Sequence, residues 1–201
     1  MGCDIHTRVE ILRNVDGKLQ WIDSDYYSRN PYYDKTDGYS RKYEVVKICG
    51  DRNYQRFATL AGVRNYGNTT PIDKPRGIPK DCNKHIKKDY QKWGCDAHTP
   101  SWFTLSELIK YQETNPVSKY SGYISPESAK KLDEENVLPD TWCQGTSDKT
   151  WVFREWECKS KVLIPMIDGL KERLKEQLYF VRDDRVLEYA DNIRIIFWFD
   201  N

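Results

Sequence analysis

The sequence has little of what membrane proteins and duplex-binding proteins usually contain. No apolar run approaches the eighteen or so residues that a membrane-spanning helix needs, and no charged-then-apolar leader opens the chain. Its 32 Lys and Arg almost balance its 31 Asp and Glu, whereas duplex nucleic acid is bound through a clear excess of cations. We therefore expect a cytosolic protein with no membrane partner and no bulk binding of duplex nucleic acid.

Histidine is also scarce. The chain has only three, and each follows a cysteine by three positions. In a turn, this spacing lets a thiolate and an imidazole converge on one zinc ion, and two such pairs complete a tetrahedron. With six cysteines and no secretory leader, we expect thiols, metal ligands or core residues rather than disulfides. Cys82, His85, Cys95 and His98 are therefore candidate zinc ligands, and the alternative is loop thiols beside unrelated histidines.

Hydrophobic periodicity predicts a sheet built from both ends of the chain. Residues 3–12 alternate as in a strand with one buried face, and Asp16-Gly17 favours a two-residue hairpin turn after it. Residues 193–199 are rich in β-branched and aromatic side chains, which indicates a buried central strand. A further strand is expected over residues 151–157. We expect the first and last strands to be neighbours in one sheet.

Capping signals indicate four helices between these strands, whereas residues 22–46 and 62–103 are predicted to be long loops. We therefore expect a single α+β domain over residues 1–201, with a mixed, mainly antiparallel sheet and with helices and long loops packed around it. The four helices are expected to begin at Asp51, at a capping box of Thr104 and Glu107, at Ser125-Pro126, and near Pro165, the last running to Tyr179.

Asp4 and His6 are the first candidate site residues. Cys3 and His6 point to opposite faces of the predicted strand, whereas Asp4 and His6 share its polar face about 7 Å apart. Both could therefore touch one ligand or one divalent metal ion. The alternative is a solvated strand face. An Asp-x-His at this place also opens the metallophosphoesterase pattern, but no Asn-His-Asp/Glu motif follows it.

The segment from His98 to Trp102 precedes a capped helix, and a helix N-terminus offers free N–H groups to an anion. At such a site His98 could act as an acid or base, Ser101 could donate a hydrogen bond and Trp102 could stack on the ligand. The alternative is a hydrophobic staple, in which Trp102 packs against the helix.

Arg64, Asn65 and Arg76 are the candidate ligands for phosphate groups. Arg76 precedes Gly77, and the missing side chain of a glycine lets an anion approach the backbone beside the guanidinium. Arg64 and Asn65 stand in the same long segment of predicted loop. The alternative for this cation-rich stretch is a solvated surface.

Five segments of this chain carry a resemblance to a known family: Met1-Gly-Cys-Asp-Ile-His6, Asn53-Tyr54 to Arg64-Asn65, Pro75-Arg76-Gly77, residues 98–102 and residues 197–201. Together they resemble a family of small tailed-bacteriophage proteins that open with Met-Gly-Cys-Asp-Ile-His. The resemblance covers nearly the whole chain and implies a phage accessory protein acting in the cytosol of the bacterial host. Similar phage proteins often antagonise host defence by binding or destroying nucleotide signals, and this analogy suggests a small nucleotide as the ligand.

Three functional hypotheses follow from these residues. In the first, the protein hydrolyses a phosphoester or pyrophosphate bond of a small nucleotide, with His6 and His98 as general acid and base. Asp4 then orients an imidazole or holds a metal ion, Arg64 and Arg76 bind phosphates, and Asp200 and Asn201 close the same end of the sheet. In the second, the same arginines and Trp102 sequester the nucleotide without turnover. In the third, a zinc-stabilised adaptor binds a host protein.

Overall fold

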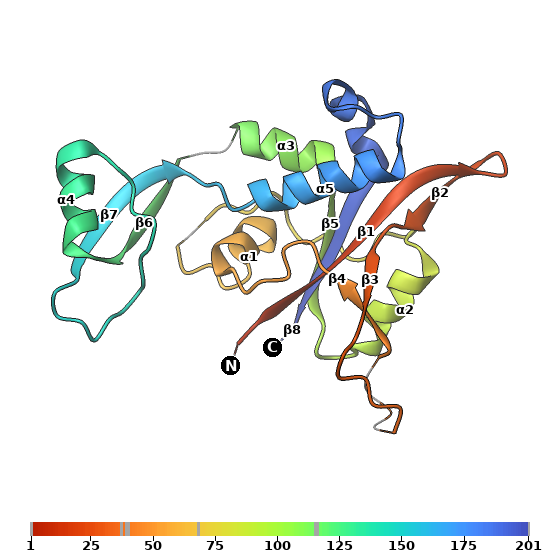
Figure 1. The fold of residues 1–201 in the computed structure, drawn as a ribbon, viewed down its shortest axis with the longest axis horizontal. Coiled ribbons are helices and arrows are strands. Elements are labelled where there is room, and N and C mark those ends of the chain that lie inside the picture. The colour runs from red at the N-terminus through yellow and green to blue at the C-terminus, as the bar shows by residue number, and fades with distance from the viewer. Residues whose placement is uncertain (1, 37, 39–40, 68, 115–116, 201) are drawn as a thin grey trace.

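Four antiparallel strands form the central sheet, in the order β2-β1-β8-β5 (Figure 1). A computed structural model describes residues 2–36, 38, 41–67, 69–114 and 117–200. The two central strands come from the two ends of the chain, which confirms both the predicted α+β class and the predicted pairing of the first and last strands. The strands are β1 (Asp4–Val15), β2 (Lys18–Asp23), β5 (His98–Thr104) and β8 (Ile193–Asp200).

The turn between β1 and β2 has the predicted two residues. Asp16 and Gly17 have φ angles of 51° and 79°. A type I′ turn requires positive φ at both central positions, and its twist matches that of the paired strands. The Asp-Gly pair therefore sets the register of the first hairpin.

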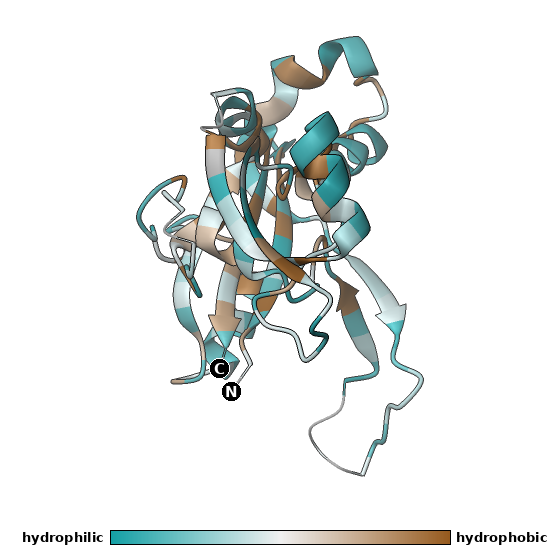
Figure 2. Cartoon of the chain, turned by 90° about the vertical axis from the view of Figure 1, so that its left-hand side faces the viewer, coloured by the Kyte–Doolittle hydropathy of each residue, from teal (hydrophilic) through white to brown (hydrophobic). Residues whose placement is uncertain are grey.

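Three helices cover one face of the sheet and enclose the main hydrophobic core, to which β1 and β8 also contribute. Figure 2 shows hydrophobic residues on the central strands and hydrophilic residues over much of the outer helical surface. Among the described residues, no helix is long and apolar enough to cross a membrane. The covering helices are α1 (Tyr54–Ala61), α3 (Leu105–Thr114) and α5 (Ile164–Gln177), and a 3-10 helix (Asp183–Asn192) precedes β8.

Two of the predicted helix caps are confirmed. At α3, Thr104 Oγ1 accepts a hydrogen bond from the Glu107 N–H at 3.3 Å, and the Thr104 N–H donates to the Glu107 carboxylate at 2.9 Å. At α4 (Pro126–Glu135), the Ser125 hydroxyl caps the helix and proline occupies its first turn. Each side chain satisfies backbone N–H groups that have no partner within the helix.

The predicted cap at Asp51 is wrong. The helix α1 is capped by Asn53, whose Oδ1 accepts a hydrogen bond from the Arg56 N–H at 3.0 Å. Asp51 instead forms an ion pair with the buried Arg56 side chain, with 2.6 Å between the nearest atoms. Both residues are good capping residues, so composition did not distinguish them.

The second face of β1 is buried as well, contrary to the prediction of a strand with one buried face. Arg8 and Glu10 on this face are 5% and 0% exposed. They are covered by a helix and a two-stranded ribbon, which lie in the segments predicted to be loops. The helix has a single buried residue, Ile86, so its sequence lacks an apolar stripe. These elements are α2 (Lys84–Lys92), β3 (Tyr26–Arg29) and β4 (Tyr43–Val46).

A smaller lobe extends from the main body on the side of α1 (Figure 1). It has an apolar cluster of its own, centred on Ile124, Ala129 and Trp156. Its last strand matches the strand predicted over residues 151–157, and the other strand was not predicted. The lobe consists of β6 (Val117–Ile124), α4 and β7 (Val152–Lys159), with β6 and β7 antiparallel.

Glu10 links α2 to the sheet through a buried charge pair. Its carboxylate accepts hydrogen bonds from the Asn83 N–H at 2.5 Å and from Arg194 Nε at 2.7 Å. The Glu10 side chain is 0% exposed and the Arg194 side chain 3%. Both charges are therefore shielded from water, and the arginine depends on this carboxylate.

We expect Glu10→Gln to lower the free energy of unfolding by about 3 kcal/mol, because it leaves the buried Arg194 without its closest negative charge. Urea unfolding followed by circular dichroism measures this loss. The matched control is Glu127→Gln, which removes an exposed ion pair with Lys131 and should cost less than about 1 kcal/mol. Equal losses in the two variants would contradict the structural role of Glu10.

Candidate functional site

His6 lies on the face of β1 that is covered by α2, directly opposite Trp198 of β8. Its ring contacts two indoles, with centroid distances of 4.1 Å to Trp93 and 5.6 Å to Trp198. Trp93 follows the last residue of α2. The imidazole is thus held among large apolar rings, and its side chain is only 13% exposed.

Asp200 holds the His6 ring in place. One carboxylate oxygen, Oδ2, lies 3.1 Å from His6 Nε2, and the other, Oδ1, accepts a hydrogen bond from the Asp4 N–H at 3.0 Å. The carboxylate is therefore fixed by the backbone of the neighbouring strand. Asp200 closes this end of the sheet as predicted, while Asn201 lies outside the described residues.

Asp4 does not orient the imidazole, which corrects one part of the predicted site. Its side chain forms two hydrogen bonds with the Arg52 guanidinium, at 2.8 and 2.9 Å. The hydrogen bonds with Arg52 hold the pKa of Asp4 below its ordinary value. The Asp4 carboxylate is thus paired with Arg52. The backbone N–H of Asp4, and not its side chain, supports the His6–Asp200 pair.

Burial and a nearby lysine favour neutral His6. Burial lowers the pKa of His6, Lys47 lowers it further, and Asp200 opposes both effects. Lys47 follows β4 and donates a hydrogen bond from Nζ to the Ile5 carbonyl at 3.2 Å. Since the Asp200 carboxylate accepts the Nε2 proton, the neutral ring keeps its lone pair on Nδ1.

A cleft of about 830 Å³ opens above His6. Its lining comes from β1 and β8, from the chain that follows β3, from β4 and its flanking residues, and from the last part of α2. Lys47 and Arg41 supply positive charge, although Arg41 is paired with Asp89 at 2.6 Å, and Tyr32 and Trp93 supply aromatic surface. The complete lining is His6, Thr7, Arg8, Asn30, Pro31, Tyr32, Arg41, Glu44, Val45, Lys47, Asp89, Trp93 and Trp198.

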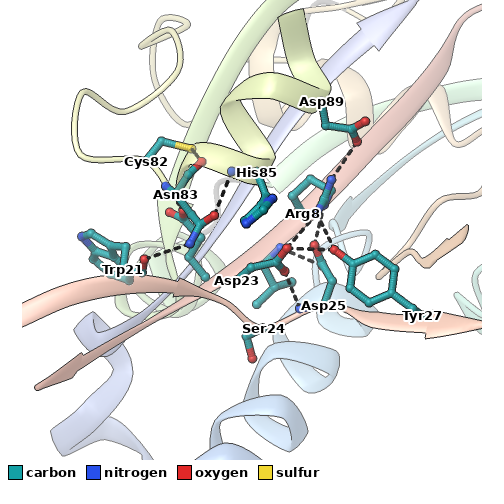
Figure 3. A network of polar contacts seen from close by, with 12 residues as sticks. Arg8, Trp21, Asp23, Ser24, Asp25, Tyr27, Cys82, Asn83, His85 and Asp89 are labelled. Atoms are coloured by element: carbon teal, nitrogen blue, oxygen red, sulfur yellow. Dashed lines mark hydrogen bonds and ion pairs between the residues drawn. The ribbon is translucent and has the colours of Figure 1, made fainter. Parts of the chain in front are cut away.

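Arg8 fixes the walls of this cleft, as Figure 3 shows. Its guanidinium lies 2.5 Å from the Asp25 carboxylate, 3.0 Å from that of Asp23 and 2.7 Å from that of Asp89, and it donates to the Tyr27 hydroxyl at 2.8 Å. Burial opposes its charge, but Asp25 and Asp23 outweigh burial and raise the pKa of Arg8. The arginine joins β1, the ribbon and α2, and its charge is already compensated.

His98 does not meet His6, so the predicted acid and base pair is not formed. Ser101 pairs with Phe197, and an unbroken ladder would therefore pair His98 with Asp200. A bulge shifts the register by one residue, so that His98 pairs with Phe199 and stacks on its ring at 5.9 Å. A shift of one residue moves a side chain to the opposite face of a sheet, away from His6.

Arg76, Ser101 and Trp102 form a structural cluster at the start of α3 rather than an anion site. Arg76 lies 2.8 Å from the Glu107 carboxylate and its guanidinium 5.1 Å from the Trp102 ring centre. The Ser101 hydroxyl is buried and accepts a hydrogen bond from the Arg76 N–H at 3.2 Å. The helix N-terminus predicted to bind an anion is occupied by the protein's own Glu107.

Arg64 and Asn65 lie away from the His6 cleft. The Asn65 amide closes a loop, donating to the Thr69 carbonyl at 2.7 Å and accepting from the Thr69 N–H at 2.8 Å. Arg64 hydrogen-bonds to Tyr66 and Cys3 and lines a separate cavity of about 400 Å³ beside α1. The predicted convergence of Arg64 and Arg76 on His6 is therefore not found.

The predicted zinc ligands do not assemble in the part of the chain that the structure describes. Within that part, no three His, Cys, Asp or Glu side chains are grouped so that they could hold a metal ion. Burial, with Glu10 nearby, raises the pKa of Cys82 to about 12, which disfavours the thiolate that zinc needs. Cys95 is exposed after α2, and His85 is exposed on that helix.

Three residues of the site, Arg41, Lys47 and Trp93, were not predicted, because they stand in segments of the sequence without periodicity. No family model, curated protein or solved structure matches the chain. The function is therefore inferred from the cleft itself, where a neutral imidazole, a fixed carboxylate and two cations lie together.

The two charged neighbours of His6 should shift its pKa in opposite directions. Asp200→Asn should lower the pKa of His6, because a negative charge that favours imidazolium is lost, and the amide oxygen can still accept the Asp4 N–H. Lys47→Met should raise it, because a positive charge is lost. Titration of the imidazole resonances by NMR measures both shifts, and shifts of the same sign would refute this arrangement.

Proposed function

We propose that the protein binds a small nucleotide in the His6 cleft and hydrolyses a phosphoester or pyrophosphate bond, with His6 as the general base. The observation that carries this proposal is the His6–Asp200 pair at the floor of a cleft that also contains Lys47, Arg41 and Trp93. An imidazole oriented by a carboxylate through one nitrogen is suited to take a proton on the other.

The roles of the residues follow from their positions. His6 Nδ1 takes a proton from water as the water oxygen attacks phosphorus, and Asp200 stabilises the imidazolium that forms. Lys47 and Arg41 stabilise the negative charge that develops on the phosphoryl oxygens. Burial lowers the pKa of Lys47, so its ammonium can also donate a proton to the leaving oxygen as that bond to phosphorus breaks.

Two aromatic residues support a ligand that has a base or another flat ring. Trp93 offers ring surface at the cleft wall, where a base could stack. Trp198 is 1% exposed, and its indole Nε1 has no hydrogen-bond partner among the described residues. Buried donors are nearly always satisfied in folded proteins, and an oxygen or nitrogen of a bound ligand would supply the missing acceptor.

A second candidate function is sequestration of the nucleotide without turnover. It is favoured by the position of His98, because His6 is the sole histidine among the described residues that line the 830 Å³ cleft. The same cations and Trp93 would then hold an intact ligand. In either case, the resemblance to tailed-phage proteins suggests that the ligand is a nucleotide signal of host defence in the bacterial cytosol.

Incubation with a panel of cyclic and linear nucleotides, followed by chromatography of the free and protein-bound fractions, tests both functions. Turnover supports the hydrolase, and recovery of intact ligand from denatured protein supports sequestration. We expect His6→Gln to reduce turnover by about 100-fold or more. His98→Gln is the matched control and should change turnover less than about threefold, since His98 faces the other side of the sheet. Loss of turnover in both variants alike would contradict the role of His6.

Turnover should also depend on pH through His6. The base must be neutral, so kcat/KM should rise with pH, with the midpoint of this rise below the ordinary histidine pKa of about 6.5, and it should fall again at higher pH where Lys47 loses its proton. In Asp200→Asn this midpoint should move to lower pH, because the pKa of His6 falls. A pH profile of kcat/KM for the wild-type protein and for Asp200→Asn measures the shift. The same midpoint in the two proteins would exclude His6 as the base.

A further inference from the structure

A second cavity of about 270 Å³ adjoins the His6 cleft. The two cavities share four lining residues, which are Arg8, Arg41, Val45 and Asp89. The second one runs between the ribbon and the outer side of α2. The second cavity therefore lies directly beside the His6 cleft, within reach of a ligand longer than one nucleotide.

The second cavity is positively charged. Lys88 and Lys92 stand one helical turn apart on α2, and Arg41 faces them from the chain before β4. Among the described residues, the ion pairs to the acidic residue of this lining come from Arg8 and Arg41 and involve neither lysine. The acidic residue of the lining, Asp89, is already held by Arg8 and Arg41, at 2.7 and 2.6 Å. Lys88 and Lys92 thus remain available for an anionic group of the ligand.

The same cavity has aromatic surface for a second base. Tyr27 and Tyr43 line it from the ribbon, and the Tyr43 side chain is exposed. The hydroxyl of Tyr27 is tied to Arg8 and Asp23, so its ring is held in place. Alternating cations and exposed rings along a groove are typical of single-strand nucleic-acid binding, in which bases stack and phosphates pair with lysines.

We infer that the substrate is a single-stranded oligonucleotide rather than a mononucleotide. One phosphate lies beside His6 and Lys47, and Lys88 and Lys92 hold another phosphate of the same strand in the second cavity. This inference rests on the proposed function and specifies its substrate class. It agrees with the nearly balanced net charge of the chain, because the cations act locally in one groove and not over a whole surface.

Binding of oligoadenylates of one, two and four nucleotides, measured by fluorescence anisotropy with a common label, tests the inference. His6→Gln protein is used so that the ligands stay intact. We expect the tetranucleotide to bind at least about tenfold more tightly than the mononucleotide. Adding Lys88→Gln and Lys92→Gln should remove this gain, leave mononucleotide binding unchanged and reduce the salt slope by about 1.4.

The matched control is Lys84→Gln with Lys87→Gln, on the same helix but not in the lining of either cavity. It removes the same charge and should change tetranucleotide binding less than about twofold. Equal affinity for all lengths, or equal losses in the two double variants, would overturn the inference. If mononucleotides are still cleaved in a His6-dependent reaction, the proposed function survives that result; if no nucleotide of any length binds, both fail.

Discussion

The antiparallel pairing of β1 with β8 is the constraint on which the rest of the structure depends. It places Asp4 opposite Asp200 and His6 opposite Trp198, and so assembles the candidate site from segments at opposite ends of the sequence. Because side chains alternate along each strand, the same pairing sends the apolar residues of β1 to the helices and Arg8 and Glu10 to the other face. The hydrophobic core and the cleft therefore lie on opposite faces of the paired strands β1 and β8.

Buried ion pairs on the cleft face of the sheet determine where the elements around the site lie. Two arginines, Arg8 and Arg194, are shielded from water there and are matched by carboxylates from elements distant in sequence. Charges buried in this way must be paired, so α2 and the ribbon are held at defined positions rather than resting on an apolar surface. These ion pairs therefore hold α2 and the ribbon in place above His6.

Local patterns predicted the strands β1, β2 and β8, the first hairpin and the caps of α3 and α4, because alternation and capping chemistry are properties of neighbouring residues. They did not predict β5, which lies in a segment expected to be a loop. The cleft walls were not predictable in this way, since α2 buries one residue and β3 and β4 are mostly exposed. The position of His98 depends on a one-residue bulge near Thr99, whose φ is 51°. The predicted alternation placed Asp4 and His6 on the correct face of β1. The positions of Arg64, Arg76 and His98 depend on tertiary contacts and on strand register, which local patterns do not determine.

The distance along the chain between His6 and Asp200, 194 residues, has a consequence for folding. A contact between such distant residues forms only after the entropy cost of closing the intervening chain has been met, so it belongs to the late, cooperative part of folding. No fragment that lacks either β1 or β8 can hold the imidazole in its orientation. The site therefore reports on the integrity of the whole domain, and a partly unfolded or cleaved chain carries its cations without a positioned imidazole.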